Sequence, residues 1–337
     1  MKSKPGEKPT TDVAVVGDVH GHLQLACCVM ARWQRELGVK FEAVFFCGDV
    51  AAFTEDAQLD NATRRHAKAN PCDIEFLTQW ATRPQAPWLD FIFKPIEDGG
   101  LGLTCPVVMV HGNHEGFSHL EEIVPAEFPE EPVAIEELPV VDTNGHVRLL
   151  PSGWRARLPS GHIVGGVGGI QPGQRRADYH PMAYITEEAV LRLLDAGQVD
   201  LLLTHQGPSG VQDDKGSDLL QPLLEEGVAR VWCHGHSITR PEPTRGGRLG
   251  QCLVVPLEGI AFHVPKQYPR SREPYHPGTD GWAWVSLSEG EAVVHKETPP
   301  FLREYCRHHW LVLDDLLVCP PLVRVAWDTQ QVKAKKT

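Results

Sequence analysis

Apolar runs recur along the chain, and polar residues follow each run at once. The runs are rich in β-branched and aromatic residues, which is typical of strands buried on both faces. They are residues 13–16, 43–47, 107–110, 201–204 and 231–233. Between the first two runs, apolar residues at near-helical spacing predict a helix over 23–37, with Gly38 as its stop. A strand, a helix and a second strand in this order predict a right-handed βαβ unit, and hence an α/β protein.

Other stretches carry weaker patterns. Thr186 is a typical N-cap for a helix over 187–196, which Gly197 would end. Residues 54–102 are more than a simple crossover needs, and we interpret them as helices plus an insertion that forms one wall of a cleft. Within that stretch, 55–69 is compatible with a helix, and the aromatic stretch 88–93 is expected to be buried. The run 310–318 is compatible with either a helix or a strand.

Composition divides the chain into three parts. Residues 1–10 are polar and rich in Lys and Pro, which predicts a disordered arm. Residues 11–297 are expected to form the folded domain. Residues 298–337 are expected to form a C-terminal extension with a disordered, Lys-rich end.

Composition also narrows the class of protein. The hydrophobic fraction of 42% is that of a globular protein, and no apolar run is long enough to span a bilayer, so no membrane role is expected. The nine cysteines are an odd number without a Cys-x-x-Cys spacing, which predicts reduced thiols and a cytoplasmic location. The net charge of −12 argues against non-specific coating of nucleic acid. It is compatible with an anionic substrate where bound metal ions reverse the local charge.

Side chains that bind metals follow the apolar runs. The two members of Asp18-x-His20, and those of His234-x-His236, face the same side of an extended segment. Carboxylates and imidazoles together suit Mn, Fe, Zn, Co or Ni better than Mg alone, and one carboxylate, that of Asp49, can bridge two cations. Two adjacent cations can activate water and hold a phosphoryl group. The candidate ligands are Asp18, His20, Asp49, Asn113, His205, His234 and His236.

The order of these blocks resembles the calcineurin-like metallophosphoesterase superfamily over roughly residues 13–260. The matching blocks are Asp18-x-His20, Gly48-Asp49, Gly112-Asn113-His114-Glu115, His205 and His234-x-His236. The resemblance implies a four-layer α/β/β/α sandwich with two central sheets and a dinuclear metal site at the strand ends.

The same resemblance implies a role for each ligand. One metal ion would be held by Asp18, His20, Asp49 and His236, and the other by Asp49, Asn113, His205 and His234. A hydroxide bridging the two ions would attack phosphorus. His114 would be catalytic, stabilising the transition state or protonating the leaving oxygen.

Within that superfamily, the middle of the chain resembles the RNA lariat debranching enzymes. The likeness continues from the Gly-Asn-His-Glu block into His119-Leu120, the Gly-rich run 165–170, Gly207-Pro208 and the block around His234. Debranching enzymes typically carry Cys at the first ligand position, where this chain has Asp18.

The phosphoprotein phosphatases share the first and third blocks but differ in the second. Their Gly-Asp-x-x-Asp-Arg-Gly has Ala52 and Phe53 here in place of the second Asp and the Arg, and His111 stands in place of the Arg before Gly-Asn-His-Glu. These departures weaken a protein-phosphatase or phosphomonoesterase interpretation.

Several residues near these blocks are candidates for substrate contacts. His22 follows the first block and is either a loop residue or a substrate contact. Arginines flank the Gly-rich run and would either be solvated or hold a phosphate or nucleotide. They are Arg155, Arg157, Arg175 and Arg176. Glu115 would polarise a neighbouring imidazole or cap a helix.

The sequence therefore predicts a dinuclear metal-dependent phosphoesterase that cleaves phosphodiesters, with Mn as the favoured ion and a nucleotide or nucleic acid as substrate. One alternative is a phosphatase or nucleotide pyrophosphatase acting on a small substrate. The other is a scaffold that binds metal without catalysis. The presence of His114 beside the ligand set argues against a scaffold, because a structural metal site does not need it.

Overall fold

The computed structural model describes residues 9–81, 86–173, 180–210, 216–237, 247–249, 252–263, 275–313 and 315–334. The predicted N-terminal arm lies outside this part except for Pro9 and Thr10, and so do the last three residues, 335–337. The domain limits at 11–297 and 298–337 stay predictions.

Six strands form the first sheet, in the order β13-β12-β1-β2-β3-β5. They are β1 (Thr11–Val16), β2 (Phe41–Phe46), β3 (Val107–Met109), β5 (Val147–Leu149), β12 (Trp282–Ser288) and β13 (Glu291–Lys296). The strands β1, β2 and β3 run parallel, as their continuous apolar runs predict, and β5 continues the parallel pairing at one edge. The hairpin β12-β13 adds antiparallel strands at the other edge.

A second sheet has the order β10-β11-β9-β8-β7-β6-β4. Its strands are β4 (Val133–Ala134), β6 (Arg155–Arg157), β7 (Ile163–Val167), β8 (Val199–Thr204), β9 (Ala229–Ser237), β10 (Gly247–Leu249) and β11 (Cys252–Glu258). Parallel pairing runs from β7 through β8 and β9 to β11, so their carboxyl ends meet at one edge.

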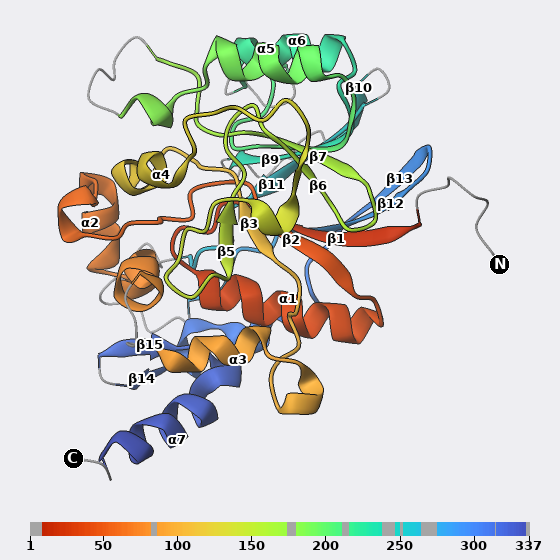
Figure 1. The fold of residues 1–337 in the computed structure, drawn as a ribbon. Coiled ribbons are helices and arrows are strands. Elements are labelled where there is room, and N and C mark those ends of the chain that lie inside the picture. Colours follow the sequence, from red (N-terminus) through yellow and green to blue (C-terminus); the bar gives the residue numbers. More distant parts are fainter. Residues whose placement is uncertain are drawn as a thin grey trace.

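The two sheets pack face to face, and helices cover their outer faces (Figure 1). Helix α1 (Leu23–Leu37) packs on the first sheet, and α5 (Glu187–Ala196) and α6 (Gln221–Glu225) pack on the second. This arrangement confirms the predicted α/β/β/α sandwich. The core between the sheets includes Val15, Phe45, Val108, Leu203 and Cys233.

Local chemistry sets the ends of the two best-predicted helices. Helix α1 ends at Gly38, whose φ of 69° is the left-handed conformation that glycine adopts at low cost. Helix α5 begins where the Thr186 side chain accepts a hydrogen bond from the Ala189 amide, and it ends at Gly197. Both helices have the predicted bounds.

The stretch 54–102 folds as short helices and turns rather than one long helix. It contains α2 (Asn61–Ala67) and α3 (Asp90–Phe93), and α4 (Phe117–Ile123) follows the Gly-Asn-His-Glu block.

Short turns occur along the whole described chain. One of them, η3 (Phe76–Trp80), is a π turn. The 3₁₀ turns are η1 (Asp56–Gln58), η2 (Pro71–Ile74), η4 (Pro87–Leu89), η5 (Ile96–Asp98), η6 (Ile135–Glu137), η7 (Pro181–Ala183), η8 (Asp218–Leu220), η9 (Leu302–Tyr305), η10 (Arg307–His309) and η11 (Pro320–Leu322).

A carboxyl group is buried where this stretch meets α1. Glu75 Oε1 accepts hydrogen bonds from the Gln24 amide and from Trp80 Nε1, each at 2.8 Å. Burial raises the pKa of Glu75 to about 8, so the neutral acid is the favoured form at pH 7.

The C-terminal part forms a hairpin and a helix against the outer face of α1. The hairpin joins β14 (Leu311–Leu313) to β15 (Leu316–Val318), which decides the ambiguous run 310–318 in favour of strands, and α7 (Val323–Ala334) follows. The Gln24 side chain donates to the Leu317 carbonyl and accepts from the Cys319 amide. This part therefore shares one core with α1 (Figure 1). Among the described residues, no helix has the length and hydropathy needed to cross a bilayer.

Candidate metal centre

The predicted ligands meet between the carboxyl ends of strands from both sheets. Asp18 and His20 follow β1, Asp49 follows β2, and Asn113 follows β3 of the first sheet. From the second sheet, His205 directly follows β8, whereas His234 and His236 lie within the last residues of β9 rather than after it. Parallel strands bring their carboxyl ends to one edge, and this explains why ligands far apart in sequence converge.

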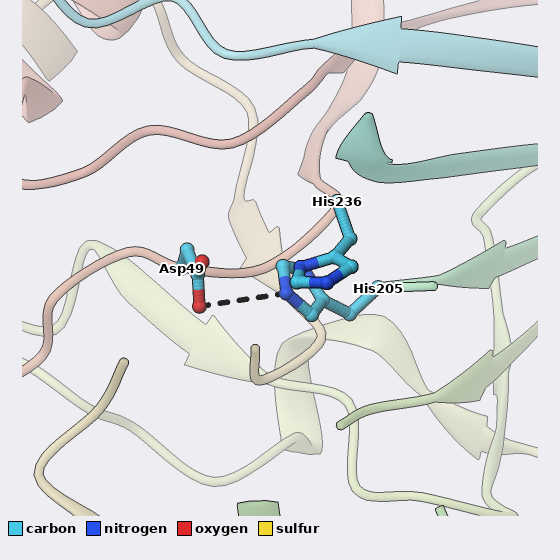
Figure 2. Close-up of side chains that lie close together, drawn as sticks. All are labelled: Asp49, His205 and His236. Carbon is cyan, nitrogen blue, oxygen red and sulfur yellow. Dashed lines mark ion pairs between the residues drawn. The ribbon is translucent and has the colours of Figure 1, made fainter. Parts of the chain in front are cut away.

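Two groups of side chains are close enough to hold one cation each, and Asp49 belongs to both. The first group is Asp18, His20 and Asp49, and the second is Asp49, His205 and His236. Ligand atoms within each group lie within 4.8 Å of one another. Figure 2 shows the second group, with Asp49 Oδ1 3.5 Å from His205 Nε2. A carboxylate shared by two groups is what a bridging ligand requires.

Hydrogen bonds around the imidazoles leave nitrogen lone pairs for a cation. His205 Nδ1 donates to the Cys47 carbonyl at 2.8 Å, so Nε2 of the neutral ring presents a lone pair, and the Asn113 Oδ1 oxygen lies 3.2 Å away. His234 Nδ1 donates to the Gly235 carbonyl, and its buried Nε2 has no partner among the described residues. An outer hydrogen bond that fixes the free nitrogen of a histidine is typical of metal ligands, so the residues present fit a divalent cation.

The carboxyl groups of Asp18 and Asp49 lie close together in this buried site, so the negative charge of one disfavours ionisation of the other. Burial, reinforced by Asp49, raises the pKa of Asp18 to about 7, although His205 opposes the rise. Burial acts in the same direction on Asp49, but the imidazoles of His205 and His20 outweigh it and hold the pKa of Asp49 below its usual range. Divalent cations would allow both carboxylates to be ionised at once.

The backbone is strained at the ligands themselves. His20, Asp49 and His236 have φ values of 42°, 47° and 50°, in the left-handed region that non-glycine residues rarely adopt. Ala51 is a fourth such residue, with φ of 61°. Strain of this kind persists where the surrounding structure holds it, and it collects at functional sites.

Two glycines allow the ligand loops to approach closely. A Cβ atom on Gly112 would lie 2.1 Å from Asp49 Oδ1, and one on Gly235 would lie 2.1 Å from Asp18 Oδ1. The space that a side chain would fill is used by the two carboxylates. Amide groups orient them: Asp49 Oδ1 accepts from the amides of Asn113 and His114, each at 2.8 Å.

His114 stands at the edge of the cluster and is paired with a carboxylate. Its Nδ1 lies 2.8 Å from Asp60 Oδ2, and the side chains are 21% and 28% exposed. Burial alone would lower the pKa of His114, but Asp60 and Asp49 raise it to about 9. The His114 and His20 rings lie 6.0 Å apart. Asp60 was not among the residues predicted from the sequence. The only local sign of its role is that an acidic residue stands at the start of a helix.

Glu115 helps to raise the pKa of the His114 and His205 imidazoles, and it also makes hydrogen bonds that neither expected role included. Its carboxylate accepts hydrogen bonds from the amides of Val50, Ala52 and Gly112. It therefore joins the loop after β2 to the loop after β3 and supports Asp49 indirectly. It neither contacts an imidazole nor caps a helix in these bonds.

The prediction that His22 contacts substrate is wrong. The side chain is fully buried, and Nδ1 lies within hydrogen-bond distance of the Val19 and His20 carbonyls. Its Nε2 contacts the Asn70 side-chain amide and the Phe262 backbone amide. His22 thus orders the loop after β1 and is closed to a ligand.

The structure does not support a phosphate-binding role for Arg155, one of the four arginines that flank the Gly-rich run. Its guanidinium donates to the Ala196 carbonyl at the end of α5 and to the Glu130 carbonyl, so it stabilises loops on the outer side of the second sheet. Arg157 is exposed on β6. Arg175 and Arg176 lie outside the described residues.

Two further side chains near the cluster, those of His111 and Cys233, are buried and structural. His111 is buried, and burial lowers its pKa to about 4, so the ring is neutral. Cys233 is buried between the sheets, and burial raises the pKa of its thiol well above the usual range. A thiol without thiolate character is unreactive.

Comparison with known proteins identifies the family. A family model described as calcineurin-like phosphoesterase matches residues 11–240, which is more than half of the 337 residues. TT1561 of Thermus thermophilus is 12% identical, with a TM-score of 0.43 over 86% of this chain and 99% of that chain. A second solved structure is also 12% identical, with a TM-score of 0.44 over 86% of this chain and 100% of that chain. None of the curated protein sequences matches. The family model covers more than half of the chain, and the chain carries the buried cluster of Asp and His side chains. The chain is therefore a phosphoesterase of the calcineurin-like phosphoesterase family.

Proposed function

We propose that this enzyme hydrolyses phosphodiesters with two divalent cations. The observation that carries the proposal is the pair of ligand groups that share Asp49, with the His114–Asp60 pair beside them. The group of Asp18, His20 and Asp49 would hold one cation, and the group of Asp49, His205 and His236 would hold the other, with Asn113 and His234 as further candidate ligands of that second cation. The site contains a candidate proton donor as well as ligands, and a purely structural metal site has no use for one.

Each of the chain's own groups has a defined task in this proposal. The bound cations would supply an activated water and neutralise charge on the phosphoryl oxygens. Asp49 holds the two sites at a fixed separation, because its carboxylate is fixed by two amides. His114 donates a proton from Nε2 to the leaving oxygen, and Asp60 holds Nδ1 so that Nε2 is the atom left to donate. Among the described residues, Nε2 has no hydrogen-bond partner to compete for that proton.

Diesters fit the site better than monoesters. A monoester carries a second negative charge that guanidinium groups commonly neutralise. At the positions where phosphatases of this superfamily carry Arg, this chain has Phe53 and His111, and both are buried. His111 is neutral as well, so neither position supplies the missing positive charge.

The native ions and substrate follow from the donor set and from the likeness to debranching enzymes. Asp18 provides an oxygen where those enzymes have a thiolate, which favours a harder ion, and we propose Mn. The middle of the chain resembles the debranching branch, so we propose a nucleotide or nucleic-acid end as the natural substrate. We also propose a cytoplasmic location, because all nine cysteines are free thiols.

A panel of chromogenic substrates tests this function. The protein is stripped with a chelator, reloaded with Mn, Ni, Fe or Zn, and assayed with p-nitrophenyl phosphate and bis(p-nitrophenyl) phosphate. We expect metal-dependent hydrolysis with a higher kcat/KM for the diester. A higher kcat/KM for the monoester with every metal would contradict the diesterase proposal.

A further inference from the structure

A cavity of about 530 Å³ opens beside the metal cluster, on the side of α2. Its volume lies within the range of roughly 300–1,000 Å³ that is typical of small-molecule sites. The cavity reaches the cluster through His20, one of the candidate ligands. A molecule bound through its phosphoryl group at the cluster can therefore extend into this space.

One carboxylate links the cavity wall to the proposed proton donor. Thr63 lines the cavity, and the Thr63 hydroxyl donates to Asp60 Oδ2 at 2.9 Å. The same oxygen of Asp60 binds His114 Nδ1, so the cavity wall and the proposed proton donor are joined by one carboxylate. The alcohol that receives the proton from His114 would be the part of the substrate nearest this wall.

The lining combines apolar surface with one half-buried acid. Ala69, Ala261 and Phe262 supply apolar wall, and Asp73 faces the cavity among them. Burial raises the pKa of Asp73 to about 7, and it forms no ion pair with any of the described residues. Asp73 Oδ1 already accepts from Asn70, so a planar group that carries N–H donors could satisfy the remaining acceptor capacity of the carboxyl, whereas an alkyl chain could not.

The acid is held in place before any ligand binds. Asn70 Nδ2 lies 3.0 Å from Asp73 Oδ1 and 2.8 Å from His22 Nε2, and His22 Nε2 in turn accepts from the Phe262 amide. This network explains why His22 is buried: it joins the metal loop to the cavity wall. Such pre-organisation reduces the entropy cost of binding.

We propose that the cavity binds the nucleoside of a phosphodiester's leaving alcohol, with the base against the apolar wall and its amino group donating to Asp73. The exposed side chains of Arg65 and His66 at the rim lie where the sugar and any further phosphate would emerge. This inference rests on the proposed diesterase function. It specifies in addition that the ester bond to the nucleoside is the one cleaved.

The test uses a substrate that contains its own control. A nucleoside methyl phosphodiester has two ester bonds, and hydrolysis gives either nucleoside and methyl phosphate or nucleotide and methanol. The Mn-loaded enzyme is incubated with adenosine methyl phosphates linked through the 3′ or the 5′ oxygen, and the products are quantified. We expect at least one of these esters to release adenosine over methanol by about tenfold or more.

Two variants assign that preference to the cavity. Ala69→Leu fills part of the cavity and should lower nucleoside release at least tenfold, with methanol release changed less than twofold. Lys68→Leu, on the neighbouring exposed residue outside the cavity, is the matched control and should leave the product ratio unchanged. Asp73→Asn should reduce the preference for adenosine over purine riboside esters, because the unsubstituted purine base carries no N–H donor.

The outcomes distinguish failure of the cavity assignment from failure of the proposed diesterase function. Equal release of nucleoside and methanol by the wild-type enzyme overturns the assignment, and so does an equal loss of both products in Ala69→Leu. Hydrolysis of neither ester bond refutes the diesterase function itself. Methanol release alone keeps the diesterase function and places the nucleoside outside this cavity.

Discussion

The pairing of His114 with Asp60 can be tested by removing one charge. Asp60→Asn keeps an oxygen at Oδ1, which accepts from the amides of Ala62 and Thr63 and caps α2, so the helix should remain folded. The substitution replaces Oδ2, which lies 2.8 Å from His114 Nδ1 and also accepts from the Thr63 hydroxyl, by an amide NH₂ that carries no charge and cannot accept either hydrogen bond. A hydrogen bond to a charged group contributes about 1.5–3 kcal/mol.

If this bond keeps His114 protonated, its loss leaves less imidazolium to donate the proton, and the apparent barrier rises by up to a similar amount. At about 1.4 kcal/mol per tenfold change, kcat should fall roughly 10- to 150-fold. The loss should be largest for alkyl leaving groups and smallest for nitrophenyl esters, whose leaving oxygens need little protonation. The assay is kcat for a series of diesters of increasing leaving-group acidity, with metal content measured in parallel.

Two controls make the result interpretable. Thr186→Ala removes the N-cap of α5, far from the cluster in sequence, and should cost about 1 kcal/mol of stability without affecting kcat. Asp60→Ala removes both the charge and the cap, so it should match Asp60→Asn in kcat but fall below it in stability. An equal loss of kcat for every leaving group in Asp60→Asn, or no loss at all, would refute the proton-donor role.

Three further predictions follow from the same structure. Asp49→Ala should lose both cations and reduce kcat at least about a hundredfold, because the carboxylate belongs to both ligand groups; full occupancy in elemental analysis would disprove the bridging role. Gly112→Ala should weaken metal affinity, since the new Cβ would lie 2.1 Å from Asp49 Oδ1, and unchanged affinity by titration would show that the loop yields. Glu75 has a folded-state pKa raised to about 8, so its contribution to stability is lost as pH rises from about 4.5 to 8. Glu75→Gln should therefore flatten the fall in Tm between pH 5 and 8, and parallel Tm curves for the two proteins would contradict the assignment.

Elements governed by neighbouring residues could be predicted from the sequence. Helices α1 and α5 have the predicted bounds because Gly38, Thr186 and Gly197 act within one turn of the helix ends. The ligand blocks could also be located, because each directly follows a buried apolar run. The order of these blocks led to the prediction of the family, and the match of the family model over residues 11–240 confirms that prediction.

Features that depend on distant contacts could not be predicted. Asp60 belongs to an insertion of short turns, and its pairing with His114, 54 positions away, exists only in the folded chain. The same holds for His22, where a motif-like position suggested substrate but the Asn70 and Phe262 contacts make it structural. The run 310–318 stayed ambiguous because its strands form only when they pack against α1.

The metal ligands come from both sheets, and this has a thermodynamic consequence beyond catalysis. Asp49 and Asn113 extend from the first sheet and His205 from the second, so a bound cation ties the two layers together at one edge. Binding energy and interlayer packing are then linked, and linkage is reciprocal. Metal at a hundredfold excess over its Kd would add about 3 kcal/mol to folding stability. A cavity-forming substitution such as Leu203→Ala, buried between the layers at a position that is not itself a ligand, would in return weaken the affinity for metal.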